Sequence, residues 1–267
     1  MAEKVDKTYW DDVWQPAEIP RAVMPEIDTL RNHSHHRFHS YFDAKLRPAA
    51  GSDRRLIEFG CAQSAWLSYF ARHLGFAVTG IDYSERGCAK AKAVLRRDGV
   101  AGEIVHADFT APPPRLLDAF DVGVSFGVAE HFEDTAECLA AFRRFLKPGG
   151  RLLTVIPNLA GSAGALQRLL SRKIYDIHVV IDREALADAH RRAGLEVLDC
   201  RYIECSNFGI VTIEPGGSPV ARVKRMLRLA LMGLSFGTWI VDRYLLRLPE
   251  TRVFSPYLIC AARKPEG

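Results

Sequence analysis

The stretch LIEFGCAQSAWL, residues 56–67, decides the fold of this chain. An apolar run leads to one glycine, and a turn of small residues then enters an amphipathic segment. Such a strand–turn–helix often holds a nucleotide, because glycine lets the backbone approach the ligand and the helix N-terminus offers free N–H donors. Only Gly60 is a glycine here, with Ala62 and Ser64 where further glycines would stand, so the neighbouring segments must identify the ligand.

The composition is that of an ordinary globular protein, with 48% hydrophobic and 25% charged residues among 267. The 36 Lys and Arg residues are spread among 32 acids, which argues against a nucleic-acid partner and favours a small-molecule acceptor. Six scattered cysteines without metal or disulfide spacing, and an N-terminus without an apolar signal sequence, predict reduced thiols and a cytoplasmic protein.

Strand and helix patterns alternate along the chain, which predicts an α/β fold with a doubly wound, mostly parallel, seven-stranded sheet. Strands are expected at 54–60, 76–82, 102–109, 120–127, 151–158, 195–205 and 252–264. Helices are expected at 65–75, 84–99, 134–146 and 181–194. Long insertions between strands are usually functional. We therefore divide the chain into an N-terminal helical lid (1–50), a cofactor-binding core (51–205), a helical insertion that roofs the acceptor site (206–251) and a last strand (252–267).

Acidic residues mark the ends of successive predicted strands. The carboxyl ends of parallel strands share one edge of a sheet, where ligands bind. We expect Asp82 to accept hydrogen bonds from both hydroxyls of a ribose, and Asp108 to accept one from an adenine amine. Tyr83 and Phe109 would supply apolar faces for the ring. Glu58, beside the turn, is expected to orient the loop or to meet an ammonium group.

In this order the segments resemble a class I S-adenosylmethionine-dependent methyltransferase. EFGCAQS (58–64) is similar to that family's ExGxGxG, and GIDYS (80–84), HADF (106–109), SFGVAEHF (125–132) and FLKPGGRLLTVIPN (145–158) resemble its later motifs. The resemblance implies a Rossmann-like methyltransferase fold, S-adenosylmethionine as cofactor, S-adenosylhomocysteine as product and no metal. The expected cofactor-binding residues are Trp14, from the N-terminal segment, and, within or beside these motifs, Glu58, Gly60, Cys61, Ala62, Ser64, Asp82, Tyr83, Ser84, Asp108, Phe109, Phe126 and Gly127.

The acceptor of such an enzyme must lie in line with the methyl group, and a hydroxyl acceptor needs a base. We predict His131 as the catalytic base, with His178 second, because histidine titrates near neutral pH. The expected acceptor is a small molecule, such as a secondary metabolite or a sugar or lipid headgroup, which receives the methyl group on oxygen or nitrogen. A role in natural product biosynthesis would follow.

Two aromatic and histidine-rich features of the first 50 residues leave alternatives open. Trp10 and Trp14 share a helix face, where they either pack the helix on the core or cover the sulfonium as a lid. The cluster of histidines is interpreted as a solvated or pocket-lining face rather than a metal site, because no HExxH acid accompanies it. Its members are His33, His35, His36 and His39.

Two other functions remain possible at this level. The first is an NAD-dependent oxidoreductase, since Asp82 would suit a nicotinamide cofactor's ribose, although the chain lacks GxGxxG. The second is a non-catalytic adapter whose basic insertion, 206–251, docks on membranes or proteins.

Overall fold

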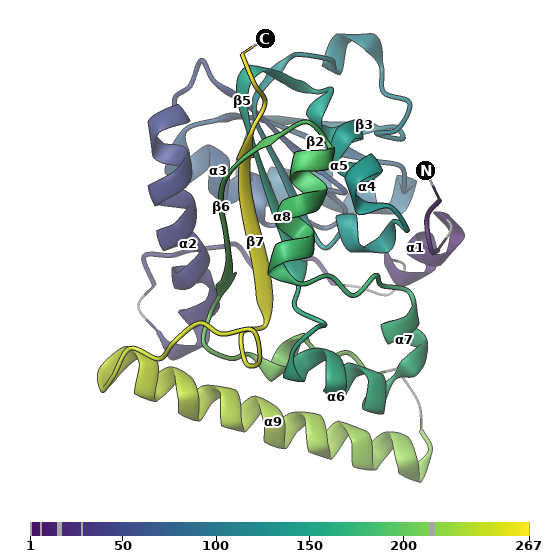
Figure 1. Cartoon of the computed structure of the whole chain (residues 1–267), viewed down its shortest axis with the longest axis vertical. Helices are drawn as coiled ribbons and strands as arrows, with labels where there is room; N and C mark the ends of the chain where they lie inside the picture. Colours follow the sequence, from purple (N-terminus) through teal and green to yellow (C-terminus); the bar gives the residue numbers. More distant parts are fainter. Residues whose placement is uncertain (1, 6, 15–17, 28, 214–216, 267) are drawn as a thin grey trace.

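The fold is built on one seven-stranded sheet with the strand order β3-β2-β1-β4-β5-β7-β6 (Figure 1). The structure is a computed structural model that describes residues 2–5, 7–14, 18–27, 29–213 and 217–266. The strands are β1 (Arg55–Phe59), β2 (Ala77–Asp82), β3 (Gly102–His106), β4 (Phe120–Phe126), β5 (Leu146–Pro157), β6 (Glu196–Ile203) and β7 (Tyr257–Arg263). The first five run parallel, and β7 pairs antiparallel with both β5 and β6, so the predicted fold class is confirmed.

Helices cover both faces of this sheet. They are α1 (Lys7–Trp14), α2 (His33–Leu46), α3 (Trp66–Leu74), α4 (Glu85–Arg97), α5 (Thr135–Arg143), α6 (Ser162–Leu170), α7 (Arg172–Asp176), α8 (Arg183–Arg192) and α9 (Pro219–Tyr244). One hydrophobic cluster packs α5 and α8 against the sheet, and a second packs α2, α3 and α4 against it. Burial of both sheet faces explains why the strands read as continuous apolar runs.

Local signals in the sequence explain where several helices begin and end. Ser84, Asp134 and Asp182 cap α4, α5 and α8, each accepting a hydrogen bond from a backbone N–H of the first turn. Gly75 ends α3 with a φ of 73°, a left-handed conformation that favours glycine. These boundaries follow those expected from the sequence.

Three strand boundaries differ from expectation. β7 begins at Tyr257 rather than 252, because residues 252–254 form a turn in which Ser255 N donates to Thr251 O at 3.1 Å. β5 begins at Leu146 rather than 151, because the KPGG segment continues the strand and exchanges hydrogen bonds with Lys264 beyond β7 (Gly149 N to Lys264 O, 2.9 Å; Lys264 N to Gly150 O, 2.8 Å). β3 ends at His106, so Asp108 lies in the following turn instead of closing the strand.

The segment between β6 and β7 contains the long helix α9, which crosses the end of the molecule below α6 in Figure 1. The short 3-10 helix η5 (Phe208–Ile210) links β6 to this region and lies against α9. α9 therefore lies at the end of the sheet where β6 finishes, which is also the carboxyl end of β5.

Candidate active site

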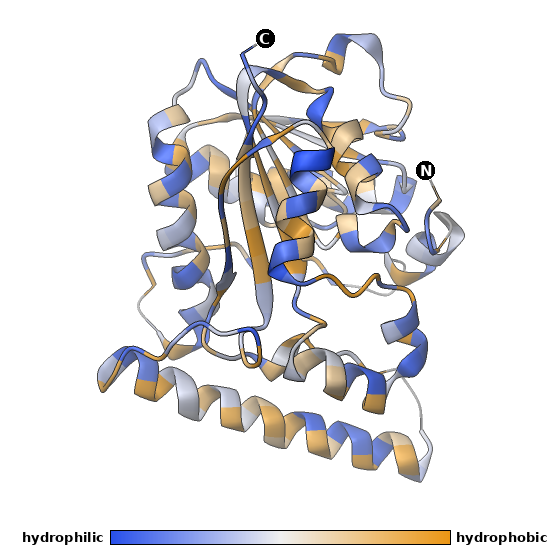
Figure 2. Cartoon of the chain, in the orientation of Figure 1, coloured by the Kyte–Doolittle hydropathy of each residue, from blue (hydrophilic) through white to orange (hydrophobic). Residues whose placement is uncertain are grey.

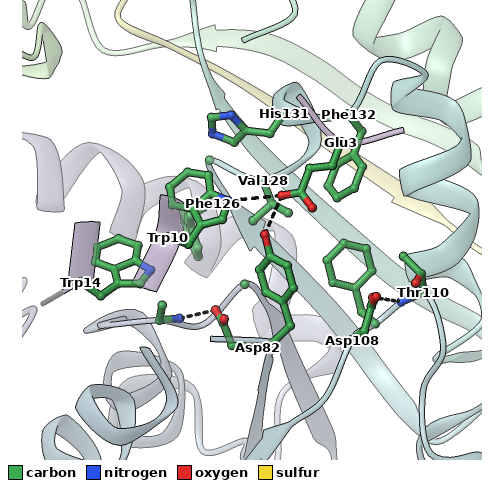
Figure 3. Close-up of a pocket in the computed structure, with 15 residues that line it drawn as sticks. Glu3, Trp10, Trp14, Asp82, Asp108, Thr110, Phe126, Val128, His131 and Phe132 are labelled. Carbon is green, nitrogen blue, oxygen red and sulfur yellow. Dashed lines mark hydrogen bonds between the residues drawn. The ribbon is translucent and has the colours of Figure 1, made fainter. Parts of the chain in front are cut away.

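A cavity of about 250 Å³ opens at the carboxyl ends of β1, β2 and β4 (Figure 3). β1 and β4 are neighbours in the sheet although they are not consecutive in the chain, and ligands bind at such switch points of open α/β sheets. The lining residues are Glu3, Trp10, Trp14, Gly60, Ala62, Asp82, Tyr83, Asp108, Phe109, Thr110, Phe126, Gly127, Val128, His131 and Phe132.

Asp82 is the acid at the centre of the cavity floor. Its Oδ2 accepts the Ala62 N–H at 2.9 Å and its Oδ1 accepts the Ser84 N–H at 2.8 Å. Burial raises the pKa of the carboxyl, and the two N–H donors oppose that rise. Each carboxylate oxygen has a further lone pair. The side chain is therefore held rigidly with acceptor capacity left for the hydroxyls of a ligand.

The turn after β1 brings the backbone close to the cavity. Gly60 has a φ of 66°, and a Cβ atom there would lie 2.6 Å from Val128 Cγ2. Both the backbone conformation and the contact require glycine at this position. Beneath the turn, Ser64 Oγ donates to Glu58 Oε2 at 2.7 Å and accepts the Trp66 N–H at 3.0 Å. These bonds support the interpretation that Glu58 orients the loop.

The opposite end of the cavity offers an apolar wall and an exposed acid. Phe109 packs edge-on against Phe132, with ring centroids 5.7 Å apart. Asp108 is exposed, and its Oδ1 accepts the Thr110 N–H at 2.7 Å. The carboxylate is thus fixed beside an aromatic surface, as the prediction of an adenine site requires.

The N-terminal segment covers the cavity. Lys4 N donates to His131 O at 2.8 Å and Glu133 N donates to Ala2 O at 3.0 Å, which holds residues 2–4 across the loop after β4. Glu3 Oε1 accepts hydrogen bonds from Tyr83 Oη at 2.7 Å and from Trp10 Nε1 at 3.2 Å. The sequence analysis missed Glu3, because no local pattern shows that the chain returns to this edge.

Trp10 and Trp14 both line the cavity and stack on each other with ring centroids 6.1 Å apart. Trp10 also contacts the His131 ring edge-on at 4.9 Å. Thr110, Val128 and Phe132 are further lining residues that the sequence analysis did not select. Val128 and Phe132 lie within SFGVAEHF, and Thr110 directly follows HADF.

Nine of the thirteen predicted cofactor-binding residues line this cavity and four lie behind its wall. Glu58, Cys61 and Ser84 are buried, at 2%, 0% and 0% exposure, and Ser64 bonds to Glu58. Cys61 packs under the turn against Gly80, where a Cβ atom would lie 2.5 Å from its sulfur. Ser84 Oγ donates to Asp11 Oδ1 at 2.6 Å. These four positions shape the turn and the helix entry rather than the surface of the cavity.

A second cavity, of about 340 Å³, shares Phe126 and Gly127 with the first. Most of its wall is aromatic or apolar, and its polar groups come from α2, from the insertion and from Tyr257 at the start of β7. The lining residues are Ser34, His35, Phe38, Trp66, Phe126, Gly127, Val155, Ile156, Pro157, Asn207 and Tyr257. The two cavities therefore meet at the end of β4.

The predicted bases His131 and His178 lie side by side, with ring centroids 4.5 Å apart. His131 lines the first cavity, whereas His178 lines a smaller pocket beneath α6. Burial, with a smaller contribution from His178, lowers the pKa of His131 to about 3. The His131 ring is therefore neutral at pH 7, which is the form that accepts a proton.

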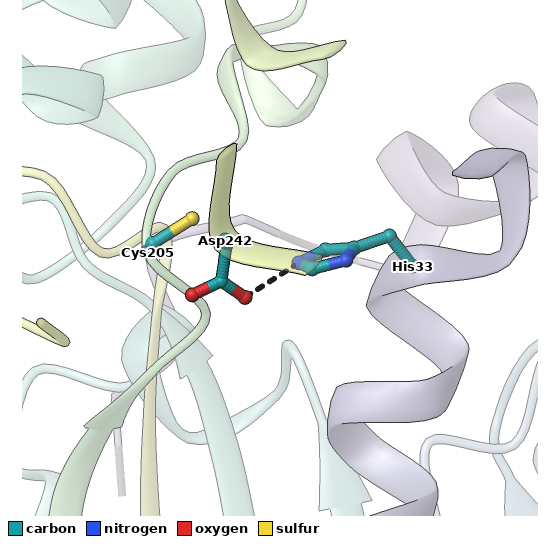
Figure 4. A group of neighbouring side chains, drawn as sticks. All are labelled: His33, Cys205 and Asp242. Atoms are coloured by element: carbon teal, nitrogen blue, oxygen red, sulfur yellow. Dashed lines mark ion pairs between the residues drawn. The ribbon is translucent and has the colours of Figure 1, made fainter. Parts of the chain in front are cut away.

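The four histidines of the first 50 residues separate. His35 lines the second cavity, while His39 Nδ1 lies 2.8 Å from Tyr69 Oη and His36 Nε2 lies 3.1 Å from Ile27 O. His33 is buried with Cys205 and Asp242 (Figure 4), and its Nε2 lies 3.6 Å from Asp242 Oδ2.

Two clusters among the described residues have ligand atoms within 4.8 Å of one another, as a metal site would need: His33, Cys205 and Asp242, and Glu130, His131 and His178. In the first, Asp242 Oδ1 accepts the Leu248 N–H at 2.8 Å and Oδ2 faces His33 and Arg247. Protein partners thus account for the acid, and the cluster joins α2 to α9. The expectation that the protein uses no metal stays a prediction.

Buried carboxyls give the protein a testable pH dependence. Burial raises the pKa of Glu58 to about 8, above the ordinary value of 4.5. A carboxyl with a raised folded-state pKa binds its proton more tightly in the folded state, so its contribution to stability is lost as pH rises from about 4.5 to about 8. Glu58→Gln mimics the protonated form and should raise the free energy of unfolding at pH 8 by about 1 kcal/mol or more, with no gain at pH 4.5.

Denaturant titrations of wild type and Glu58→Gln at several pH values would check this expectation. Glu103→Gln, at an exposed strand position, is the matched control. The same pH dependence in all three proteins would contradict the buried, protonated state of Glu58.

A family model described as a methyltransferase domain matches residues 33–199, more than half of the chain. The chain belongs to this methyltransferase family. The class I S-adenosylmethionine-dependent methyltransferase resemblance is thereby confirmed. The matched range includes β1 to β5 and the edge at which both cavities of this methyltransferase open.

Curated relatives carry the name ubiquinone biosynthesis O-methyltransferase. That of Pseudomonas aeruginosa strain LESB58 is 31% identical over 154 residues, which are 55% of this chain and 66% of that protein. That of Thiobacillus denitrificans is 33% identical over 160 residues, 56% of this chain and 66% of the relative. The methyltransferase thus spans about two thirds of the length of these relatives.

Solved structures share the fold at low sequence identity. The cyclase SpnF superposes with a TM-score of 0.63 at 18% identity, covering 100% of this chain and 97% of that one. The geranyl diphosphate C-methyltransferase of Streptomyces coelicolor superposes with a TM-score of 0.58 at 14% sequence identity, covering 97% of this chain and 98% of that one. One of these neighbours is a cyclase, so the fold alone does not assign the reaction.

Proposed function

We propose that this protein transfers a methyl group from S-adenosylmethionine to a hydroxyl oxygen of a small molecule. The observation that carries the proposal is the pair of cavities that meet at Phe126 and Gly127. One cavity has the donor and acceptor groups of a nucleoside site, and the other has room for an organic acceptor. Their junction lets one ligand face the other in line, as methyl transfer requires.

The first cavity fits S-adenosylmethionine through its own residues. Asp82 would accept hydrogen bonds from the ribose hydroxyls. Asp108 would accept one from the adenine amine, beside the aromatic ring of Phe109. Trp10 and Trp14 cover the remaining side, where an indole face attracts the sulfonium. When bound, this cofactor supplies the electrophilic methyl group.

The second cavity favours a ring-containing or otherwise apolar acceptor with a polar group. Phe38, Trp66 and Tyr257 supply aromatic surface, and Ser34 and Asn207 supply hydrogen-bonding groups. An oxygen acceptor also agrees with the names of the O-methyltransferase relatives. A hydroxyl acceptor requires a base within reach of its proton.

His35 is a candidate base that the tertiary structure adds to His131 and His178. Asn32 Nδ2 donates to Met24 O at 2.6 Å and to Ile27 O at 3.1 Å, which determines the orientation of the amide. Asn32 Oδ1 must then accept the Nδ1–H of His35 at 2.7 Å. This tautomer leaves a lone pair on His35 Nε2, in a side chain that lines the acceptor cavity. We propose His35 as the base, while the roles of His131 and His178 stay predictions.

Calorimetry with S-adenosylhomocysteine and with NAD separates the proposal from its alternatives. S-adenosylhomocysteine should bind at a single site and NAD should not. NAD binding without S-adenosylhomocysteine binding would favour the oxidoreductase, and binding of neither would favour the adapter. Incubation with methyl-labelled S-adenosylmethionine and a metabolite extract then identifies the acceptor from the labelled product.

A further inference from the structure

The helix α9 exposes an apolar face to the surroundings. Val223, Met226 and Leu234 are 65%, 66% and 55% exposed. Further exposed apolar residues of the helix are Val220, Leu227, Leu229, Ile240 and Tyr244. At 3.6 residues per turn these residues lie on one half of the helix circumference, together with the exposed Ala230, Gly233 and Gly237. Figure 2 shows hydrophobic residues recurring along the whole of this helix.

The opposite side of α9 is bound to the protein and carries both polar residues, such as Ser235 and Asp242, and apolar ones, such as Trp239. Ser235 Oγ accepts the Phe208 N–H at 2.8 Å, and Trp239 Nε1 donates to Ser206 O at 2.7 Å. Asp242, near the end of the helix, faces His33 (Figure 4). A surface helix of a globular protein normally turns its apolar side to the core and its polar side to water. α9 instead turns a mostly apolar half outward, with Arg222 near its edge, so this face suits an apolar medium.

The charge of α9 indicates the kind of medium. The helix carries the basic residues Arg222, Lys224, Arg225, Arg228 and Arg243 against a single acid, Asp242. That acid is 6% exposed and lies on the inner side. The helix therefore presents a positive potential beside its apolar face, a combination typical of helices that lie on anionic lipid.

We propose that α9 docks the protein on the surface of an anionic phospholipid bilayer, with the helix parallel to the membrane plane and its apolar face toward the acyl chains. At 1.5 Å per residue its 26 residues extend about 39 Å. Among the described residues, no helix has the length and apolar character needed to span a bilayer, which agrees with attachment at the interface. The proposal does not depend on the identity of the methyl acceptor.

Other apolar side chains enlarge the docking face. Leu245 and Leu246, directly after α9, are 77% and 66% exposed. Leu169 is 70% exposed and precedes Leu170, whose carbonyl oxygen accepts a hydrogen bond from Lys224 at 2.6 Å. Leu169 of α6 thus lies near α9. A second copy of the chain is a poorer occupant, because two such helices would bring like charges together.

The docking face lies close to the acceptor cavity. Asn207 lines that cavity and directly precedes η5. Arg228 of α9 donates a hydrogen bond to the carbonyl oxygen of Gly209, a residue of η5, at 3.1 Å. A bilayer in contact with α9 would therefore lie at the same end of the strands as the proposed acceptor site.

Cosedimentation of the full chain with phosphatidylcholine vesicles, with and without phosphatidylglycerol, at physiological salt tests the proposal. Wild type should bind the anionic vesicles. Val223→Glu/Leu234→Glu should lower the partition coefficient by about tenfold or more, because it puts charge into the apolar face. The control Ile19→Glu/Leu198→Glu adds the same charge at exposed positions outside the helix (43% and 45% exposed) and should bind as wild type does.

Wild type that stays in the supernatant with anionic vesicles would overturn the proposal, as would undiminished binding of the α9 variant. A wild-type dimer in sedimentation velocity that dissociates in the α9 variant, without vesicle binding, would assign the face to a second copy instead. Thermal unfolding checks that each variant folds. Two single variants repeat the comparison with a smaller perturbation: Ile240→Glu in α9, and Leu198→Glu as its control outside the helix. Both positions are 45% exposed.

Discussion

Replacing His35 with Ala is expected to lower turnover about 100-fold or more while the affinity for S-adenosylhomocysteine stays unchanged. The side chain lines the acceptor cavity and not the cofactor cavity, so its loss should affect the proton acceptor and not cofactor binding. His36→Ala is the matched control, because His36 is the next residue on α2 and does not line the second cavity. Turnover is measured once a labelled product has identified the acceptor.

The pH profile adds a readout that loss of packing would not produce. Burial, with a smaller effect of His36, lowers the pKa of His35 below its ordinary 6.5. A base acts in its neutral form, so kcat should rise with pH through that lowered pKa, and the midpoint of the rise should lie below pH 6.5. His35→Ala should remove this acid limb.

His131→Ala and His178→Ala compare the structure-based candidate with the sequence-based ones. A large loss of turnover in His131→Ala with normal turnover in His35→Ala would contradict the proposed role of His35 and support the original prediction. Near-normal turnover in all three variants would mean that proximity alone catalyses the transfer. That outcome favours an amine acceptor, which can lose its proton to water.

Replacing Asp82 with Ala is expected to weaken S-adenosylhomocysteine binding by about 10- to 150-fold, equivalent to about 1.5–3 kcal/mol for hydrogen bonds to a charged group. The Asp82 carboxylate would accept hydrogen bonds from the ribose hydroxyls, whereas an alanine side chain has no acceptor atom. The variant also releases the Ala62 and Ser84 N–H groups, so part of the effect arises from a looser turn.

Isothermal titration calorimetry measures this loss of affinity. Asp188→Ala, at an exposed position of α8 outside the cavity lining, should bind as wild type does. Thermal unfolding without ligand separates a loss of the turn's stability from a loss of direct contacts. Unchanged affinity of Asp82→Ala would exclude Asp82 from the cofactor site.

The alternation of strands and helices could be read from the sequence because each element carries its own local signal. β1 and β4 are buried on both faces, and Ser84, Asp134 and Asp182 stand directly before the helices that they cap. Parallel order then brings the strand ends to one edge by topology alone. That Gly60, Asp82 and Asp108 meet at one cavity could therefore be predicted without coordinates.

The strand boundaries near β5 depended on partners distant in the chain. KPGG has the composition of a turn, but pairing with Lys264 beyond β7 extends the strand through it. Hydrogen bonds of this kind override local propensity, because an unpaired buried backbone group is costly.

The sequence by itself determined the sheet, its ligand-binding edge and the methyltransferase family, since these follow from periodicity and from motifs within single elements. Only the tertiary structure decided that Glu3 returns over the first cavity, that His35 rather than His33, His36 or His39 lines the second cavity, and that α9 turns apolar side chains outward. Those three facts depend on contacts between segments far apart in the chain. The amphipathic pattern of a helix records that it has two faces, whereas the contacts of Trp239 with Ser206, of Ser235 with Phe208 and of Asp242 with His33 decide which face is bound.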